Sequence, residues 1–185
     1  LFGEKEKLAP KPVEIIRNGV DARLFRSRSN ESQNTTTEVV GYFGALAEWF
    51  DIELMEYLLS NNPQIKFEII GLISRPEIAN RLKRFKNIEF RGEVPNSELP
   101  DMVSAWKAGL IPFKVTPLIS ATNPVKIYEY ASLGIPTVAS AIPEVKLASL
   151  DCMGIFTSST FEEFNRNLGL AIARDNFDLS DLTNW

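Results

Sequence analysis

The chain contains no histidine and only one cysteine, Cys152, among its 185 residues. Without histidine, a Ser-His-Asp arrangement, an imidazole general base and a histidine-ligated metal are all excluded within this chain. A lone cysteine cannot close an internal disulfide or complete a thiolate zinc site, so nothing in the sequence requires an oxidising compartment. We therefore expect a cytoplasmic location and no metal site built from histidine or thiolate ligands.

Long apolar runs and an excess of positive charge are also missing. Lys and Arg number 20 against 24 Asp and Glu, which gives a formal net charge of −4. This balance opposes broad binding to nucleic-acid phosphates, and the apolar runs are far shorter than the roughly 20 residues that span a bilayer. We expect no nucleic-acid partner and no direct membrane insertion. The hydrophobic share of 44% and the charged share of 24% instead indicate one ordinary globular domain.

What the chain does have is a regular alternation of strand-like and helix-like segments. Six apolar runs are typical of buried strands, at 39–43, 67–70, 88–90, 110–113, 137–139 and 154–156. Apolar residues at helical spacing follow Asp51 and Ser97, and Thr160 with Glu163 forms a capping box before a third helix. Strands linked by helices in this way lie parallel. The pattern predicts an α/β fold with a doubly wound, Rossmann-like, mostly parallel six-stranded sheet and helices on both faces.

The segment before this alternation has a different character. Residues 26–37 are rich in Ser, Thr and Asn, which predicts a mobile polar loop. This loop separates a leading segment, residues 1–25, which holds a short apolar run, from the main body at 38–185. The first residue is Leu1 and no signal peptide follows it, so we expect a piece of a longer protein.

The most informative motif follows the strand-like run at 110–113. Asn123 suits an N-cap, Pro124 suits the first helical position and Gly134 suits a C-terminal stop. Together they predict a helix over about 124–133. Its first turn would face the crevice at the carboxyl ends of the strands, where free N–H groups and the helix dipole favour a phosphate.

Candidate ligand-binding residues lie on this helix and at other strand ends. Lys126 and Glu129 share one helix face, so the ammonium would meet a phosphate and the carboxylate a sugar diol. The alternative is an ion pair on a solvated surface. Gly44 would let the backbone approach a ligand closely, or it forms only a tight strand-to-helix turn. Arg75 and Arg91 lie just past strands, where a guanidinium reaches a base or phosphate or is simply solvated.

A set of segments occurs together in one order, at 18–21 (NGVD), 41–51, 67–71, 87–100, 110–113 and 123–140. In this order they resemble the C-terminal half of a glycosyltransferase family 4 (group 1) enzyme of the GT-B fold, from about residue 13 to the end of the chain. The resemblance implies that 38–185 is a Rossmann-like nucleotide-sugar-binding domain and that 1–25 holds the interdomain connection and a first short strand, with both ends trimmed. The implied partner is the N-terminal acceptor-binding domain of the same parent chain.

The resemblance also implies roles for single residues. Glu129 matches the glutamate that binds the ribose hydroxyls of the nucleotide. Gly44 and Ala45 match the loop near the donor phosphates, and Val94 with its neighbours matches the loop that flanks the base. The helix start that cradles the phosphates in the family corresponds to Asn123, Pro124, Val125 and Lys126. Arg75 completes the expected nucleotide-sugar-binding set.

Two features depart from the family pattern. Ala121 stands where the upstream glutamate of the family's pair would contact the sugar. Ala45 stands where many members carry an arginine, and Phe50 or a neighbour stands where they carry a lysine. The usual cationic clamp on the phosphates is then replaced, and Lys126 is the expected substitute. We assign Lys126 the catalytic role of stabilising the departing diphosphate.

The function implied by the resemblance is donor binding in a retaining glycosyltransferase that moves a sugar from a nucleoside diphosphate sugar to a hydroxyl acceptor, in glycan or polysaccharide biosynthesis. No cofactor and no metal is required. The fragment alone is expected to bind the donor without turnover. In a full-length parent, a peripheral place at the inner face of the membrane is an alternative to a freely cytoplasmic one. Two other functions stay open: a non-catalytic GT-B-like binding or assembly module, and a sugar-nucleotide epimerase.

Overall fold

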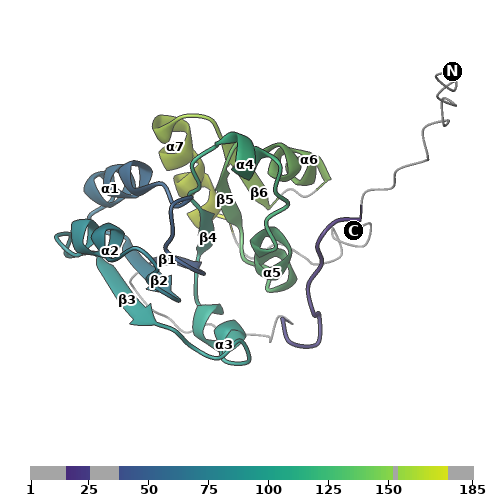
Figure 1. Ribbon diagram of the computed structural model, residues 1–185, viewed down its shortest axis with the longest axis horizontal. Helices are drawn as coiled ribbons and strands as arrows, with labels where there is room; N and C mark the ends of the chain where they lie inside the picture. The colour runs from purple at the N-terminus through teal and green to yellow at the C-terminus, as the bar shows by residue number, and fades with distance from the viewer. Residues whose placement is uncertain (1–15, 26–37, 152–153, 175–185) are drawn as a thin grey trace, which may run out of the picture.

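The computed structural model describes residues 16–25, 38–151 and 154–174. The predicted polar loop at 26–37 and most of the predicted leading strand therefore lie outside the described residues, as does the C-terminal segment from residue 175. The described part forms one sheet with helices packed on both of its faces (Figure 1).

The sheet has six strands in the order β3-β2-β1-β4-β5-β6, and every neighbouring pair is parallel. The strands are β1 (Val39–Phe43), β2 (Lys66–Ile70), β3 (Ile88–Gly92), β4 (Ala108–Ile111), β5 (Thr137–Ser140) and β6 (Ile155–Ser158). This order is that of a doubly wound dinucleotide-binding fold, which reverses direction between β1 and β4. The predicted fold class is confirmed.

Helices follow the strands in alternation. They are α1 (Ile52–Asn61), α2 (Pro76–Leu82), α3 (Leu99–Val103), α4 (Pro117–Ser120), α5 (Lys126–Ser132), α6 (Pro143–Asp151) and α7 (Phe161–Ile172). Helices α1, α2 and α7 cover one face of the sheet and α3, α5 and α6 cover the other (Figure 1), as right-handed crossover connections require. With both faces covered, the central strands β4 and β5 are buried along their whole length.

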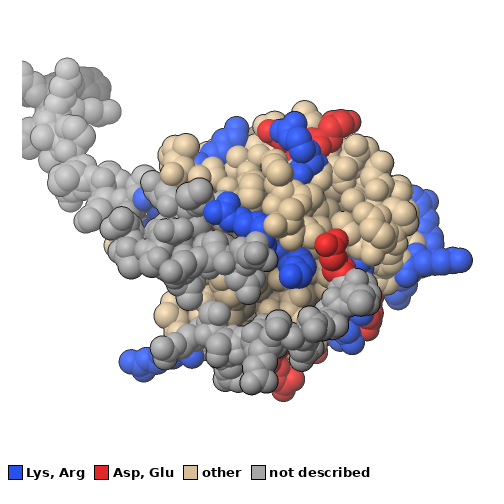
Figure 2. Space-filling model, turned by 180° about the vertical axis from the view of Figure 1, so that it is seen from behind, with Lys and Arg blue, Asp and Glu red and all other residues tan. Residues whose placement is uncertain are grey.

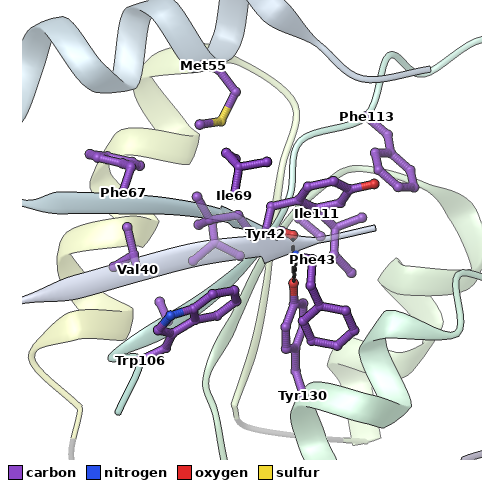
Figure 3. Close-up of a cluster of buried hydrophobic side chains, with 14 of the residues drawn as sticks. Val40, Tyr42, Phe43, Met55, Phe67, Ile69, Trp106, Ile111, Phe113 and Tyr130 are labelled. Atoms are coloured by element: carbon purple, nitrogen blue, oxygen red, sulfur yellow. Dashed lines mark hydrogen bonds between the residues drawn. The ribbon is translucent and has the colours of Figure 1, made fainter. Parts of the chain in front are cut away.

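The core is closed around β1 and β4 by large rings that pack on glycines. A β-carbon on Gly41 would collide with the indole of Trp106, and one on Gly109 would lie 2.7 Å from ring carbons of Tyr130. Figure 3 shows Trp106 and Tyr130 on one side of β1, with Met55 on the other. Because interiors are packed as densely as organic crystals, these rings occupy space that a side chain on either strand would need.

The predicted helix starts after Asp51 and Thr160 are confirmed, and the predicted start at Pro124 is wrong. Asp51 caps α1 by accepting a hydrogen bond from the backbone N of Leu54 at 3.1 Å. Helix α5 begins at Lys126, with Val125 as its N-cap residue and no side-chain cap, rather than at Pro124 behind an Asn123 cap. The helix after Ser97 is also shorter than its apolar spacing indicated.

The capping box of α7 is present as predicted. The hydroxyl of Thr160 accepts from the backbone N of Glu163 at 3.1 Å, and the Glu163 carboxylate accepts from the backbone N of Ser159 at 2.7 Å. The first bond satisfies a donor that the helix start leaves unpaired, and the second ties the Glu163 side chain to Ser159, the residue before the cap. The cap fixes where α7 begins against the end of β6.

Removing this cap should cost stability. Thr160→Ala is expected to lower the free energy of unfolding by about 1 kcal/mol, because the amide of Glu163 loses its acceptor. Thr160→Ser keeps the oxygen and serves as the control, with a smaller expected loss. Urea unfolding of the three proteins measures the difference. Equal losses for alanine and serine would contradict the capping explanation.

Candidate functional site

A pocket opens at the carboxyl edge of the sheet, where the strand order reverses. It has a volume of ≈ 230 Å³, and we call it the switch-point pocket. Open α/β sheets bind ligands at this place because the loops diverge there. Its lining comprises Phe43, Gly44, Ala45, Ile70, Gly71, Leu72, Glu93, Val94, Asn96, Leu99, Lys126 and Glu129. Five predicted site residues belong to this set: Gly44, Ala45, Val94, Lys126 and Glu129.

Two glycines shape the floor of the pocket. Gly44 directly follows β1 with φ 138° and Gly71 directly follows β2 with φ 133°, a region that residues with a side chain rarely adopt. A β-carbon on Gly71 would meet the carbonyl group of Gly44, so the two loops lie backbone against backbone. The N–H of Gly44 donates to the carbonyl of Ile70 at 2.8 Å and is therefore not available to a ligand.

Lys126 crosses this glycine floor. A β-carbon on Gly44 would lie 2.6 Å from Cε and 2.8 Å from Nζ of Lys126, so the glycine makes room for the lysine side chain. Nζ lies 5.7 Å from the ring centroid of Tyr42 and 5.4 Å from that of Phe43, within range of cation–π attraction. Burial lowers the pKa of Lys126, and the charge of Glu129 partly offsets this. The ammonium is thus short of hydration and favours a negatively charged neighbour.

Glu129 lies one turn further along α5 and lines the same pocket. Its Oε2 atom is buried and has no hydrogen-bond partner among the described residues. Burial raises the pKa of Glu129, and the charge of Lys126 partly offsets this. The salt bridges of the described residues do not include a Lys126–Glu129 pair. The alternative of an ion pair on a solvated surface is therefore not supported.

The buried carboxyl of Glu129 should make stability depend on pH. Because its pKa is raised on folding, its favourable contribution is complete below the unfolded-state pKa of about 4.3 and is lost as pH rises through the folded-state value. Glu129→Gln removes this loss. The free energy of unfolding of the variant relative to the native chain should therefore rise between about pH 4 and pH 8. Urea unfolding at both pH values tests this, and a constant difference would contradict it.

Asn123 does not cap α5, because its side chain is engaged elsewhere. Its Oδ1 accepts from the backbone N of Asn18 at 2.9 Å and from the hydroxyl of Tyr128 at 3.1 Å. Its Nδ2 donates to Glu144 at 3.4 Å, and its carbonyl accepts from the Asn18 amide. The side chain thus joins the segment at 16–25 to the residues that lead into α5. It is absent from the lining of the switch-point pocket.

Three further predicted residues also lie outside that lining. Pro124 and Val125 precede α5, one buried and one exposed. Arg75 stands at the start of α2, where its guanidinium pairs with Glu77 at 3.5 Å. Sequence spacing placed it past a strand correctly, but the turn of the β2–α2 loop takes it away from the pocket.

Arg91 also has a structural partner. Its guanidinium contacts Glu68 at 2.8 Å and Glu89 at 2.9 Å. Glu68 is buried, and it also accepts from the indole N–H of Trp106 at 3.0 Å. These contacts lower the pKa of Glu68 against the opposing effect of burial. The arginine therefore satisfies a buried carboxylate rather than a ligand.

The sequence analysis missed several lining residues. Gly71 could have been found, because a glycine directly after the apolar run of β2 carries the same signal as Gly44. Glu93 and Asn96 lie in the loop between β3 and α3, and neither has a local signature. Their place at the pocket follows from the sheet order, which puts β3 two strands from β1.

Neither a cluster of metal-binding side chains nor a membrane-spanning helix is found among the described residues. In 16–25, 38–151 and 154–174 there is no cluster of three or more Asp, Glu, Cys or His side chains that could hold a metal ion. None of the helices in these ranges combines the length and apolar character that a membrane span requires. Figure 2 shows acidic and basic side chains interspersed on the visible part of the described surface.

Comparison with known proteins identifies similar chains. No protein-family model matches the chain. It is 23% identical over 142 residues to the protein named "Putative teichuronic acid biosynthesis glycosyltransferase TuaH" of Bacillus subtilis (strain 168), a match that covers 71% of this chain and 35% of that protein. The chain thus spans about a third of the length of this relative.

Solved structures share its fold at low sequence identity. Anabaena HepE, crystallised with UDP and glucose, has a TM-score of 0.66 and 18% identity over 92% of this chain and 50% of its own. Sucrose-phosphate synthase from Thermosynechococcus elongatus has a TM-score of 0.65 and 16% identity, and the match covers 88% of this chain and 43% of that protein. WaaG, a glycosyltransferase involved in lipopolysaccharide biosynthesis, has a TM-score of 0.62 and 15% identity, and the match covers 87% of this chain and 47% of that protein. The chain therefore has the Rossmann-like fold found in about half the length of these GT-B-type proteins.

Proposed function

We propose that this chain is the donor-binding domain of a retaining family 4 glycosyltransferase, which moves a sugar from a nucleoside diphosphate sugar to a hydroxyl acceptor. The observation that carries the proposal is the convergence of Lys126 and Glu129 over Gly44 at the switch point of the sheet. The UDP and glucose bound to HepE support a nucleotide-sugar ligand. The names of TuaH and WaaG support a role in glycan or polysaccharide assembly.

The diphosphate would lie against Lys126. Its ammonium donates charge-assisted hydrogen bonds to phosphate oxygens, and the N–H of Ala45 has no acceptor among the described residues and is a further donor. Helix α5 has only seven residues, so its dipole adds little and the lysine carries most of the interaction.

The nucleoside would occupy the opposite side of the pocket. The unpaired Oε2 of Glu129 needs a donor, which the ribose hydroxyls supply. Val94 and the neighbouring residues of the β3–α3 loop would flank the base. Each group then acts in the role that the family resemblance implies.

The reaction requires stabilisation of the departing diphosphate. Charge on the leaving oxygen grows in the transition state, and an ammonium already fixed over Gly44 stabilises it with little reorganisation. Burial lowers the pKa of Lys126. The negative charge of an approaching diphosphate would raise this pKa again and keep the lysine charged. No metal ion is required for this step. Without an acceptor-binding half, these 185 residues should bind the donor but not transfer the sugar.

Calorimetric titration with UDP, GDP and their sugars tests the proposal. We expect one of the two nucleotides to bind to the chain, and sugar transfer only in a full-length parent. Absence of nucleotide binding by both the chain and its parent would refute the proposal.

One observation favours a non-catalytic module as the second candidate. Ala121, at the end of α4, carries no carboxylate where the family pattern has its sugar-contacting glutamate. A full-length parent that binds the nucleotide but never transfers or epimerises the sugar would support this candidate.

A further inference from the structure

A second pocket opens at the same edge of the sheet, beyond the ends of β4, β5 and β6. We call it the strand-end pocket. Its volume is ≈ 390 Å³, against ≈ 230 Å³ for the switch-point pocket, and the two share no lining residue. Its size falls within the range of about 300 to 1,000 Å³ that is typical of small-molecule sites. The starts of α1 and α7 complete its wall.

Two buried serine residues, each with a hydroxyl whose hydrogen has no acceptor in the part of the chain that the structure describes, line this pocket. Ser140 and Ser158 face each other in register across β5 and β6, and they are only 6% and 5% exposed. Each hydroxyl oxygen accepts one hydrogen bond, from the backbone N of Phe113 at 3.1 Å and from Nδ2 of Asn167 at 3.0 Å respectively. Neither hydroxyl donates to an acceptor within the described residues. A buried O–H is costly to leave unpaired, so both point to a ligand rich in oxygen.

The rest of the wall combines apolar and charged groups. Phe161 and Phe113 contribute aromatic surface, the carboxyl of Asp51 is half-buried, and Lys146 stands exposed at the rim. One acid and one base leave the pocket close to neutral, which opposes a strongly charged ligand. A pyranose fits this combination, because its hydroxyls both donate and accept while its C–H face packs on an aromatic ring.

The two pockets adjoin one another through shared structure. The β1–α1 loop lines the switch-point pocket with Gly44 and Ala45 at its start and the strand-end pocket with Asp51 at its end. The ring of Tyr42 lies 6.0 Å from that of Phe113 and 5.7 Å from Nζ of Lys126. Figure 3 shows Tyr42 directed toward Phe113. A ligand in the strand-end pocket is therefore separated from Lys126 by one loop and one buried ring.

We propose that the strand-end pocket binds a pyranose ring of the acceptor. Ser140 and Ser158 donate to its oxygens, the Asp51 carboxylate accepts from a hydroxyl, and Phe161 packs against the ring face. The role of this pyranose as the acceptor rests on the proposed glycosyltransferase function, whereas the binding of a pyranose to this pocket does not. The inference places part of acceptor recognition in the same domain as the donor.

Saturation-transfer NMR on this chain with the methyl pyranosides of glucose, galactose and mannose tests the inference. We expect saturation of the ring protons of at least one of them at about 10 mM, a concentration that fills most of a site with a Kd of about 1 mM. Val115→Trp should close the pocket and reduce the saturation about tenfold, since Val115 lies on its rim and is 52% exposed. Leu118→Trp is the matched control, because Leu118 is 75% exposed and lies outside the lining.

The outcomes separate this inference from the proposed function. Saturation that is lost in Val115→Trp, retained in Leu118→Trp and unaffected by UDP supports the strand-end site. The inference is overturned if saturation persists in Val115→Trp or if UDP abolishes it. It is also overturned if none of the three pyranosides shows saturation. UDP titration of the same samples reports on the donor site alone. A chain that binds the pyranoside in this pocket but not UDP would contradict the proposed function and leave the pyranose site standing.

Discussion

Lys126→Met is expected to lower the affinity of the chain for its nucleoside diphosphate by about 10- to 100-fold. Hydrogen bonds to charged groups contribute about 1.5–3 kcal/mol, and each tenfold change in affinity corresponds to about 1.4 kcal/mol. Methionine keeps the length of the side chain over Gly44 and removes only the ammonium. Calorimetric titration of the native chain and the variant with UDP and GDP measures the loss.

The fold should survive this substitution. Burial lowers the pKa of Lys126, so below its folded-state pKa the charged lysine opposes folding, and methionine removes that cost. Loss of the favourable charge interaction with Glu129 acts in the opposite direction. Lys107→Met is the control, since Lys107 is exposed at the other edge of the sheet, before β4. Equal nucleotide affinity in native chain, variant and control would remove Lys126 from the site.

Gly71→Ala should be among the most destabilising single substitutions in the chain. Its φ of 133° strains any residue with a β-carbon, a cost of about 1–3 kcal/mol. The added carbon would also lie 2.9 Å from the carbonyl carbon of Gly44 and 3.1 Å from its nitrogen. Backbone cannot move aside as a flexible side chain can, so we expect a loss of about 2 kcal/mol or more in the free energy of unfolding. Urea unfolding measures it.

A second glycine supplies the control for this experiment. Gly169 lies within α7, and a β-carbon there would meet nothing within 4 Å. Gly169→Ala should therefore stabilise the chain by about 0.5–1 kcal/mol, through the better helix propensity of alanine. Similar effects of the two substitutions would contradict the close approach of the loops at Gly71 and Gly44. Gly71→Ala should also weaken nucleotide binding, because it displaces the floor of the switch-point pocket.

The fold could be predicted from the sequence because its signals are local and repeated. Buried parallel strands appear as continuous apolar runs, and β4 and β5 are short runs of this kind. The helix starts at Asp51 and Thr160 could be predicted because the capping residue and its partner are three positions apart. Strand ends were less well predicted, since β4 ends at Ile111 and the apolar run continues to Phe113.

The failure at Asn123 has a physical cause that no local pattern contains. An asparagine before a proline is a good cap, but its Oδ1 accepts instead from Asn18, which is 105 residues away in the chain. The choice between a cap and a tertiary contact depends on where the 16–25 segment lies in space. The same applies to Arg91, whose partner Glu68 is brought near by the pairing of β2 with β3.

The candidate site was partly predictable, because some of its residues carry local sequence signals. Lys126 and Glu129 share a helix face by their spacing, and Gly44 ends a strand at the edge where α5 begins. Glu93 and Asn96 could not be found because loop residues lack periodicity. The strand-end pocket was also missed, since Ser140 and Ser158 come together only through the register of β5 on β6.

The packing of Trp106 on Gly41 and of Tyr130 on Gly109 constrains how this sequence can evolve. A larger residue on either strand is harmful while the ring stays, and a smaller residue in place of the ring leaves a void while the glycine stays. Each intermediate with one change should therefore be less stable than the present pair. Such epistasis predicts that descendants of this chain keep or replace each glycine and its ring as a unit.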